Sequence, residues 1–198
     1  RKMRMDIPLS YTLEFFQQLF AENVIGNGVQ NGIVNFMAFR NNAAENLSKT
    51  KVDFCFDVTQ TDILETGSPL EMDMLKEITV NTNLLSNIRV HCPENVYAES
   101  YASENDLDDV ILLNPNKRIA RSIYGNLLFL QGNMIRIPKQ TEGAYISPLM
   151  ENFVTFVHKT NLAEIDQAEM NAFESQKADE ILMISDEKGI FPVTKIRN

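Results

Sequence analysis

The sequence is poor in the residues that build metal sites, disulfide frameworks and membrane spans. Its 198 residues contain no tryptophan, two histidines and two cysteines, and no uninterrupted apolar run is long enough to span a bilayer. Cys55 and Cys92 make neither a metal-binding spacing nor a disulfide framework. We therefore expect two small buried thiols, a reducing cytoplasmic compartment, no metal site and no membrane partner.

Positive charge is also scarce. The chain has 18 lysines and arginines against 27 aspartates and glutamates, which gives a formal net charge of −9. This balance repels phosphate backbones, so we expect no nucleic-acid partner. Hydrophobic residues make up 44% of the chain and charged residues 23%, which is typical of a folded globular protein large enough to bury a core.

Known catalytic motifs are missing as well. The sequence has no Walker-type loop, serine elbow, zinc-protease helix or calcium loop. His158 lies on a predicted helix rich in aromatic residues and is more typical of a surface or boundary residue than of a catalyst. His91 could activate the thiol of Cys92, but sequence neighbours point in different directions in most conformations. The residues alone therefore predict no catalytic group.

Hydrophobic periodicity predicts an alternation of strands and helices. The predicted helices cover residues 11–23, 94–105, 148–159 and 167–175. The predicted strands cover residues 33–39, 52–58, 77–84, 110–113, 127–130, 134–137, 181–184 and 191–194, and residues 61–73 read as a connection. In the strand over 52–58 the apolar side chains face a core while Asp53 and Asp57 face water. Antiparallel runs of strands with inserted helices favour the α+β class.

A series of motifs in a fixed order runs through the second half of the chain. They are Asp108-Asp109-Val110-Ile111-Leu112-Leu113-Asn114, Gly125-Asn126-Leu127-Leu128-Phe129-Leu130, Ala178-Asp179-Glu180-Ile181-Leu182-Met183 and Gly189-Ile190-Phe191-Pro192-Val193. In this order they resemble the class IV aminotransferases, which include branched-chain and D-amino acid aminotransferases and aminodeoxychorismate lyase. Upstream, residues 95–105 resemble the helix after that family's catalytic lysine, and residues 11–40 its smaller domain.

The resemblance implies an α+β, D-amino acid aminotransferase-like fold of two domains. Residues 1–84 would form a small α/β domain that is incomplete at its N-terminus, because the family's opening strands are missing. Residues 85–198 would form a larger domain with a curved sheet and flanking helices. The family also forms homodimers, so the resemblance implies a homodimer here.

The family's cofactor is pyridoxal phosphate, held as a Schiff base by a lysine amine. The position of that lysine falls on Ile88 or, with one residue deleted, on Arg89. Neither side chain forms a stable imine. A shift of the alignment by a few residues over 86–95 stays open, but no lysine occurs between Lys76 and Lys117.

The other cofactor contacts of the family also fall on unsuitable residues. The carboxylate opposite the pyridine nitrogen is replaced by Arg121, and a phosphate-binding threonine by Leu149. The second phosphate-binding threonine falls on Asp186 or Glu187, whose charge repels a phosphate. The family's phosphate-binding arginine would precede residue 1.

Three hypotheses follow. The leading one is a class IV aminotransferase-like pseudoenzyme without cofactor or catalytic residues. Its cleft would hold Arg89, Arg121, Tyr124 and Asp186, where the arginines either bind a small anionic metabolite or are neutralised by nearby acids. The second hypothesis is an active transaminase or lyase that uses pyridoxal phosphate in an unusual way. The third is a dimeric scaffold that binds another protein.

Overall fold

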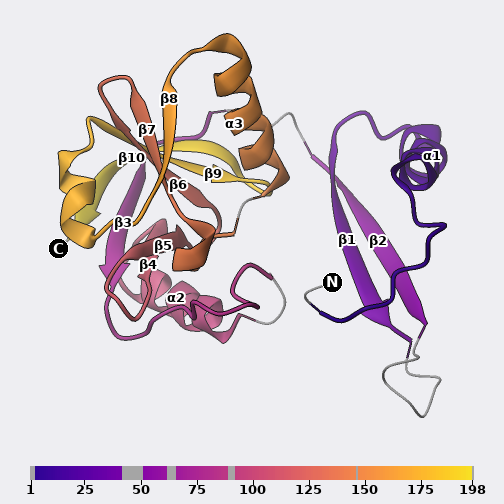
Figure 1. The fold of residues 1–198 in the computed structure, drawn as a ribbon, viewed down its shortest axis with the longest axis horizontal. Helices are drawn as coiled ribbons and strands as arrows, with labels where there is room; N and C mark the ends of the chain where they lie inside the picture. The colour runs from indigo at the N-terminus through magenta and orange to yellow at the C-terminus, as the bar shows by residue number, and fades with distance from the viewer. Residues whose placement is uncertain (1–2, 42–50, 62–65, 89–91, 146, 198) are drawn as a thin grey trace. The chain divides into compact units, whose positions relative to one another are not determined.

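The computed structural model describes residues 3–41, 51–61, 66–88, 92–145 and 147–197 (Figure 1). The chain divides into two compact units, residues 1–63 and 64–198. The family resemblance implies a division near residue 84. In the structure, however, residues 70–75 form a strand inside the sheet of the second unit, so the division comes earlier in the chain.

Unit 1 consists of a helix and two antiparallel strands. Its elements are α1 (Leu13–Asn23), the short 3-10 helix η1 (Ile25–Asn27), β1 (Gly32–Arg40) and β2 (Val52–Gln60). The ring of Phe16 in α1 meets the rings of Phe36 and Phe54 edge to face, with centroids 5.2 and 5.3 Å apart. Phe20 meets Phe56 in the same way. The predicted apolar face of the second strand is therefore confirmed.

Unit 2 is built on an eight-stranded sheet of order β5-β4-β3-β10-β9-β6-β7-β8. The strands are β3 (Leu70–Leu75), β4 (Asp109–Leu113), β5 (Ile119–Ser122), β6 (Asn126–Gln131), β7 (Met134–Pro138), β8 (Glu164–Ala168), β9 (Glu180–Ser185) and β10 (Gly189–Arg197). β3 runs parallel to β4 and β10, and β7 to β8, while the other neighbours are antiparallel. The N–H of Ile119 in β5 donates to the carbonyl of Met170 beyond β8, so the two ends of the sheet approach each other and the sheet is curled.

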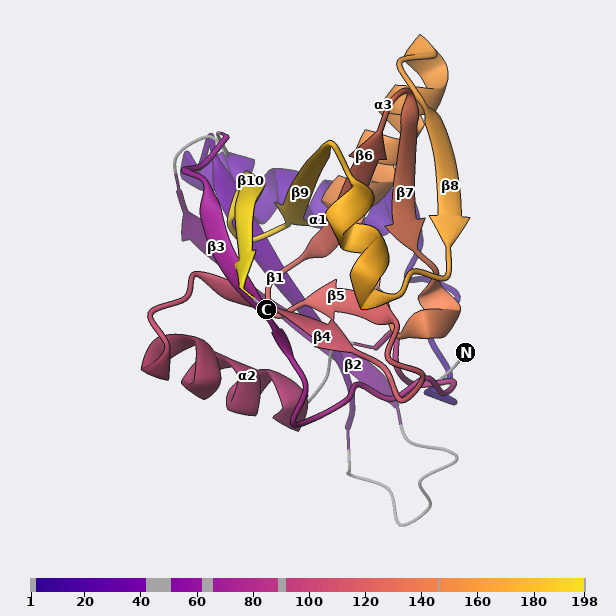
Figure 2. The same ribbon diagram turned by 90° about the vertical axis from the view of Figure 1, so that its left-hand side faces the viewer.

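Two α-helices and two 3-10 helices accompany the sheet among the described residues of unit 2. They are α2 (Pro93–Glu104), η3 (Gln140–Glu142), α3 (Pro148–Thr160) and η4 (Ala172–Lys177). Figure 2 shows α2 alongside β3 and β4, and α3 alongside β6 to β8. This arrangement places the N-terminus of α3 beside the turn between β9 and β10, where Leu149 contacts Asp186.

The two faces of the sheet bury different side chains because neighbouring residues of a strand point to opposite sides. In β4, Ile111 and Leu113 pack inside the curl, whereas Val110 and Leu112 pack against Ala98 of α2. Leu128 of β6 packs in a third cluster with residues of α3. The sheet is thus apolar on both faces, and the helices cover the outer one.

The structure corrects three of the predicted elements, over residues 61–73, 77–84 and 167–175. Residues 167–175 do not form one helix, because Asn171 and Glu174 cap each other's backbone N–H groups and start the short helix η4 at residue 172. The residues before this cap pair with β7 as β8 instead. The predicted strand over 77–84 is a loop, whose Val80 N–H donates to the carbonyl of Leu113, and the strand lies earlier as β3.

The prediction of two buried thiols was also wrong: Cys55 is exposed and Cys92 is half-buried. Cys55 lies between Phe54 and Phe56 in β2, so it points to the face opposite α1.

Within the described residues, no helix is both long and apolar enough to cross a bilayer.

Candidate functional site

Two of the residues that the resemblance places at the family's cofactor contacts, Ile88 and Arg121, line one cavity of about 300 Å³ in unit 2. Its walls come from the loop after β3, the first turn of α2, β5 and Gly143. Gly143 has a φ of +99°, and a Cβ at this position would lie 2.9 Å from the side chain of Val80. The cavity therefore depends on a glycine at this corner.

Arg121 is a buried cation held by neutral groups. The residue is only 4% exposed. The guanidinium donates to the carbonyl of Ser122 at 3.0 Å and to Oδ1 of Asn95 at 2.7 Å, and it lies 5.2 Å from the ring centroid of Tyr145. Burying a cation without a counter-charge costs on the order of several kcal/mol.

No carboxylate among the described residues forms an ion pair with Arg121. Glu94 lines the same cavity, but its Oε1 accepts from Nδ2 of Asn81 at 3.5 Å. Neutralisation of this arginine by a nearby acid, one of the two alternatives, is therefore not seen among the described residues.

Leu149 and Asp186 are also brought together, at the N-terminus of α3. Ser147 caps this helix by accepting the N–H of Met150 at 3.3 Å. The N–H of Leu149 donates to Oδ1 of Asp186 at 2.9 Å. A carboxylate at a helix N-terminus stabilises the helix by about 0.3–1 kcal/mol, because it faces free N–H groups and the positive end of the helix dipole. The chain thus places its own anion at this end of α3.

Asn126 connects these two places, and sequence reasoning missed its role. Its Nδ2 donates to the carbonyl of Tyr145, whose ring lies beside Arg121, and its Oδ1 accepts the N–H of Ser147 at 3.3 Å. Asn126 is 2% exposed. The sequence signal was a polar residue at the start of an otherwise apolar strand, which marks a side chain whose hydrogen bonds must be satisfied inside the protein.

Tyr124 does not line the cavity of Arg121. Its ring instead faces Lys188, whose Nζ lies 3.4 Å from the ring centroid. Burial, together with nearby carboxylates, raises the pKa of Tyr124 above its usual value. Arg89, another residue assigned to the cleft, lies outside the described residues.

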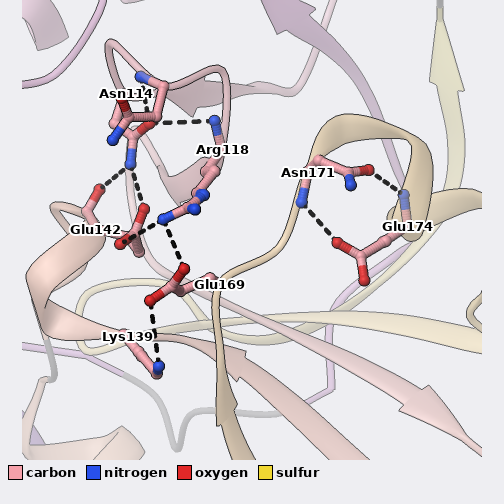
Figure 3. A network of polar contacts seen from close by, with 8 residues as sticks. Asn114, Arg118, Lys139, Glu142, Glu169, Asn171 and Glu174 are labelled. Carbon is pink, nitrogen blue, oxygen red and sulfur yellow. Dashed lines mark hydrogen bonds and ion pairs between the residues drawn. The ribbon is translucent and has the colours of Figure 1, made fainter.

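A polar network holds the segment that precedes Gly143 (Figure 3). Nδ2 of Asn114 donates to Oε2 of Glu142 at 2.7 Å, and Arg118 pairs with Glu142 at 3.3 Å and with Glu169 at 2.7 Å. Oδ1 of Asn114 accepts the N–H groups of Asn116 and Arg118. The network fixes the turn between β4 and β5 against η3.

Asp109 is another buried ionisable group in this part of unit 2. It is 0% exposed, and its Oδ1 accepts the N–H of Ile123 at 2.9 Å and that of Val110 at 2.7 Å. Its Oδ2 has no hydrogen-bond partner among the described residues. Burial raises the pKa of this carboxyl above its usual value, so folding favours its neutral form.

Comparison with solved structures shows the fold. The chain superposes on a putative 4-amino-4-deoxychorismate lyase of Legionella pneumophila with a TM-score of 0.83 and 14% identity, over 97% of this chain and 72% of that one. It matches the branched-chain aminotransferase of Thermobaculum terrenum in its PLP form with a TM-score of 0.82 and 18% identity, over 96% of this chain and 64% of that one. A PLP-bound aminotransferase of Brucella abortus superposes with a TM-score of 0.81 and 10% identity, over 98% of this chain and 71% of that one.

The chain therefore spans between 64% and 72% of the length of these three structures. No curated protein matches its sequence significantly. The sequence profile of one family, described as Amino-transferase class IV, matches residues 2–196, nearly the whole chain. Together with the curled mixed sheet, this match shows that the chain belongs to the class IV aminotransferase family.

Proposed function

We propose that this chain keeps the class IV aminotransferase fold without Schiff-base catalysis and that the cavity at Arg121 binds a small anionic metabolite. The observation that carries the proposal is that Arg121, a residue only 4% exposed, lines a cavity and has no ion pair with any described residue. A small carboxylate or phosphate ester would supply the missing counter-charge.

The residues present do not fit pyridoxal phosphate. When bound, this cofactor supplies an aldehyde for a lysine amine, a pyridine nitrogen that needs an acid beside it, and a phosphate dianion. The chain has no lysine between Lys76 and Lys117, and Arg121 occupies the position that the resemblance assigns to the acid. The carboxylate of Asp186 already accepts the N–H of Leu149 and would repel a phosphate there. The described residues therefore offer this cofactor neither a covalent anchor nor its usual charged partners.

Arg121 retains donors for an anion. A guanidinium has five N–H donors, and two of them are used by Ser122 and Asn95, which leaves three. Two parallel N–H groups can hold a carboxylate or phosphate in a bidentate arrangement. In such a complex Arg121 binds and orients the anion and transfers no proton, because its guanidinium stays charged.

Thermal unfolding tests the ligand. Propionate, succinate and inorganic phosphate are added separately, and we expect at least one to raise Tm because a ligand at 100 times its Kd stabilises by about 2.7 kcal/mol. The shift should disappear in Arg121→Gln and persist in Arg136→Gln, which removes an arginine of unit 2 that pairs with Asp166 and Glu174 outside the cavity. If none of the three anions raises Tm, the ligand proposal is wrong.

An active pyridoxal phosphate enzyme is the second candidate, and the PLP-bound structures of Thermobaculum terrenum and Brucella abortus favour it. Equimolar pyridoxal phosphate followed by borohydride separates the two. The pseudoenzyme should stay colourless and unmodified. A stoichiometric covalent adduct on one lysine, with absorbance at the edge of the visible range, would instead support the enzyme.

We also propose that the chain forms a homodimer in the cytoplasm. This part of the proposal rests on the family resemblance. Light scattering of the purified chain tests the dimer, for which we expect twice the chain mass of 22.6 kDa. A monomeric mass would remove both the homodimer and the dimeric-scaffold hypothesis.

A further inference from the structure

Another cavity of unit 2 is larger than the one at Arg121 and has a volume of about 460 Å³. It lies at the C-terminal ends of the parallel strands β3 and β4, beside Lys76 and Asn114, the residues that follow these strands. Leu75, Ile78, Leu113 and Ala172 give it apolar walls. Its volume falls within the range of about 300–1,000 Å³ that is usual for small-molecule sites.

The walls of this cavity are held by hydrogen bonds. The N–H of Val80 donates to the carbonyl of Leu113 at 2.9 Å and ties the loop after β3 to the end of β4. The side chain of Asn114 is anchored to Glu142 on one side and to the turn between β4 and β5 on the other (Figure 3). A cavity with fixed walls binds a ligand at a smaller entropic cost than one that must be ordered first.

The charge at this cavity is opposite to that of the whole chain. Two lysines, Lys76 and Lys117, line it, and no lining residue is acidic, although the chain has a net charge of −9. Both lysines are exposed and neither forms an ion pair with a described residue. Their ammonium groups are therefore available to an anion at the edge of the apolar walls.

Lys117 adds an independent observation. It has a φ of +57°, a left-handed conformation that is strained for a lysine and that glycine adopts freely. Its N–H donates to the carbonyl of Asn114 at 2.8 Å and closes the turn. A glycine at this position would relax the backbone while removing the ammonium group.

We infer that this cavity binds a small amphipathic anion, with an apolar body of about eight carbons and a carboxylate or phosphate head held by Lys76 and Lys117. The apolar body would contact Leu75, Ile78 and Leu113. This site lies apart from Arg121, and it stands whether or not Arg121 binds a metabolite.

Isothermal titration calorimetry with octanoate, octanol and propionate tests the inference. Octanoate should bind at least about tenfold more tightly than propionate, because each buried methylene contributes a factor of about four. Octanoate should also bind about threefold or more tightly than octanol, because octanol has no charge for the lysines. Octyl phosphate in place of octanoate then shows which head group is preferred.

Lys117→Gly is the decisive variant, and Lys159→Gln is its matched control. Lys159 is an exposed lysine of α3 that does not line the cavity. Lys117→Gly should unfold at the same Tm as the parent or higher, yet bind octanoate about threefold or more weakly. Lys159→Gln should bind it like the parent. The inference is overturned if the parent does not bind octanoate, if octanol binds equally well, or if Lys117→Gly leaves octanoate binding unchanged.

Discussion

The guanidinium of Arg121 is held by the amide of Asn95, which accepts from it at 2.7 Å and donates to the carbonyl of Ile123 at 3.3 Å. A neutral amide fixes the position of the cation without cancelling its charge. A carboxylate has nearly the same shape as this amide. Replacing Asn95 by aspartate therefore adds a negative charge beside Arg121 without changing the size of the side chain that holds the guanidinium.

We predict that Asn95→Asp weakens binding of the responsive anion at least about tenfold, because the new carboxylate neutralises Arg121 and competes with the ligand. The change in Tm with anion concentration measures the effect. Asn133→Asp, which changes an exposed asparagine between β6 and β7, is the control and should leave the response unchanged. An unchanged response in Asn95→Asp would show that the anion binds elsewhere.

The carboxylate of Asp186 should stabilise unit 2 through the N-terminus of α3. We expect Asp186→Ala to lower the free energy of unfolding by about 0.5–1 kcal/mol, because the N–H of Leu149 loses a negatively charged acceptor at the helix N-terminus. Urea unfolding followed by circular dichroism measures it. Glu180→Gln removes an exposed carboxylate of β9 and should cost less than about 0.5 kcal/mol. Equal losses in both variants would contradict a specific role for Asp186.

Asp109 should make the protein less stable as the pH rises. Burial raises the pKa of this carboxyl in the folded state above its ordinary value of 3.8, so the folded state binds the proton more tightly than the unfolded state. Its contribution to stability is therefore complete below about pH 3.8 and is lost as the pH rises through the folded-state pKa. Asp109→Asn removes this titration while an amide oxygen still accepts from Ile123.

The measurement for Asp109 is the free energy of unfolding of both proteins between pH 4 and 7. The parent should lose stability relative to Asp109→Asn across this window. A constant offset between the two curves would mean that Asp109 has the same pKa in the folded and unfolded states.

Gly125→Ala should destabilise unit 2 by about 1–3 kcal/mol, because an added methyl group in a packed interior forces its neighbours apart. A Cβ at position 125 would overlap the backbone oxygen of Ile184 in β9. Gly26→Ala is the control, since its Cβ would meet only the carbonyl of Ala21 at 3.5 Å. Chemical denaturation compares the two, and a neutral Gly125→Ala would contradict the close approach of this turn to β9.

Local patterns were enough to predict most elements of the fold. The helices of 94–105 and 148–159 and the hairpin of 127–137 are confirmed, because proline at the first turn, apolar spacing and a Gly-Asn turn act over a few residues. β3 was missed although Leu70, Met72 and Met74 alternate with Glu71 and Asp73. Its acidic residues and the nearby Gly-Ser-Pro run made the segment read as a connection.

The order of motifs in the sequence by itself determined the family and the α+β class. The sequence also determined that isoleucine and arginine stand where the resemblance expects a lysine and a carboxylate. Only the tertiary structure decided that Ile88 lines a cavity with Arg121, that Leu149 donates to Asp186, and that Asn126 joins the two places. These contacts connect residues from separate strands, loops and helices. Such contacts form when a curled sheet brings distant segments together, whereas sequence periodicity reports only on neighbours within a few residues.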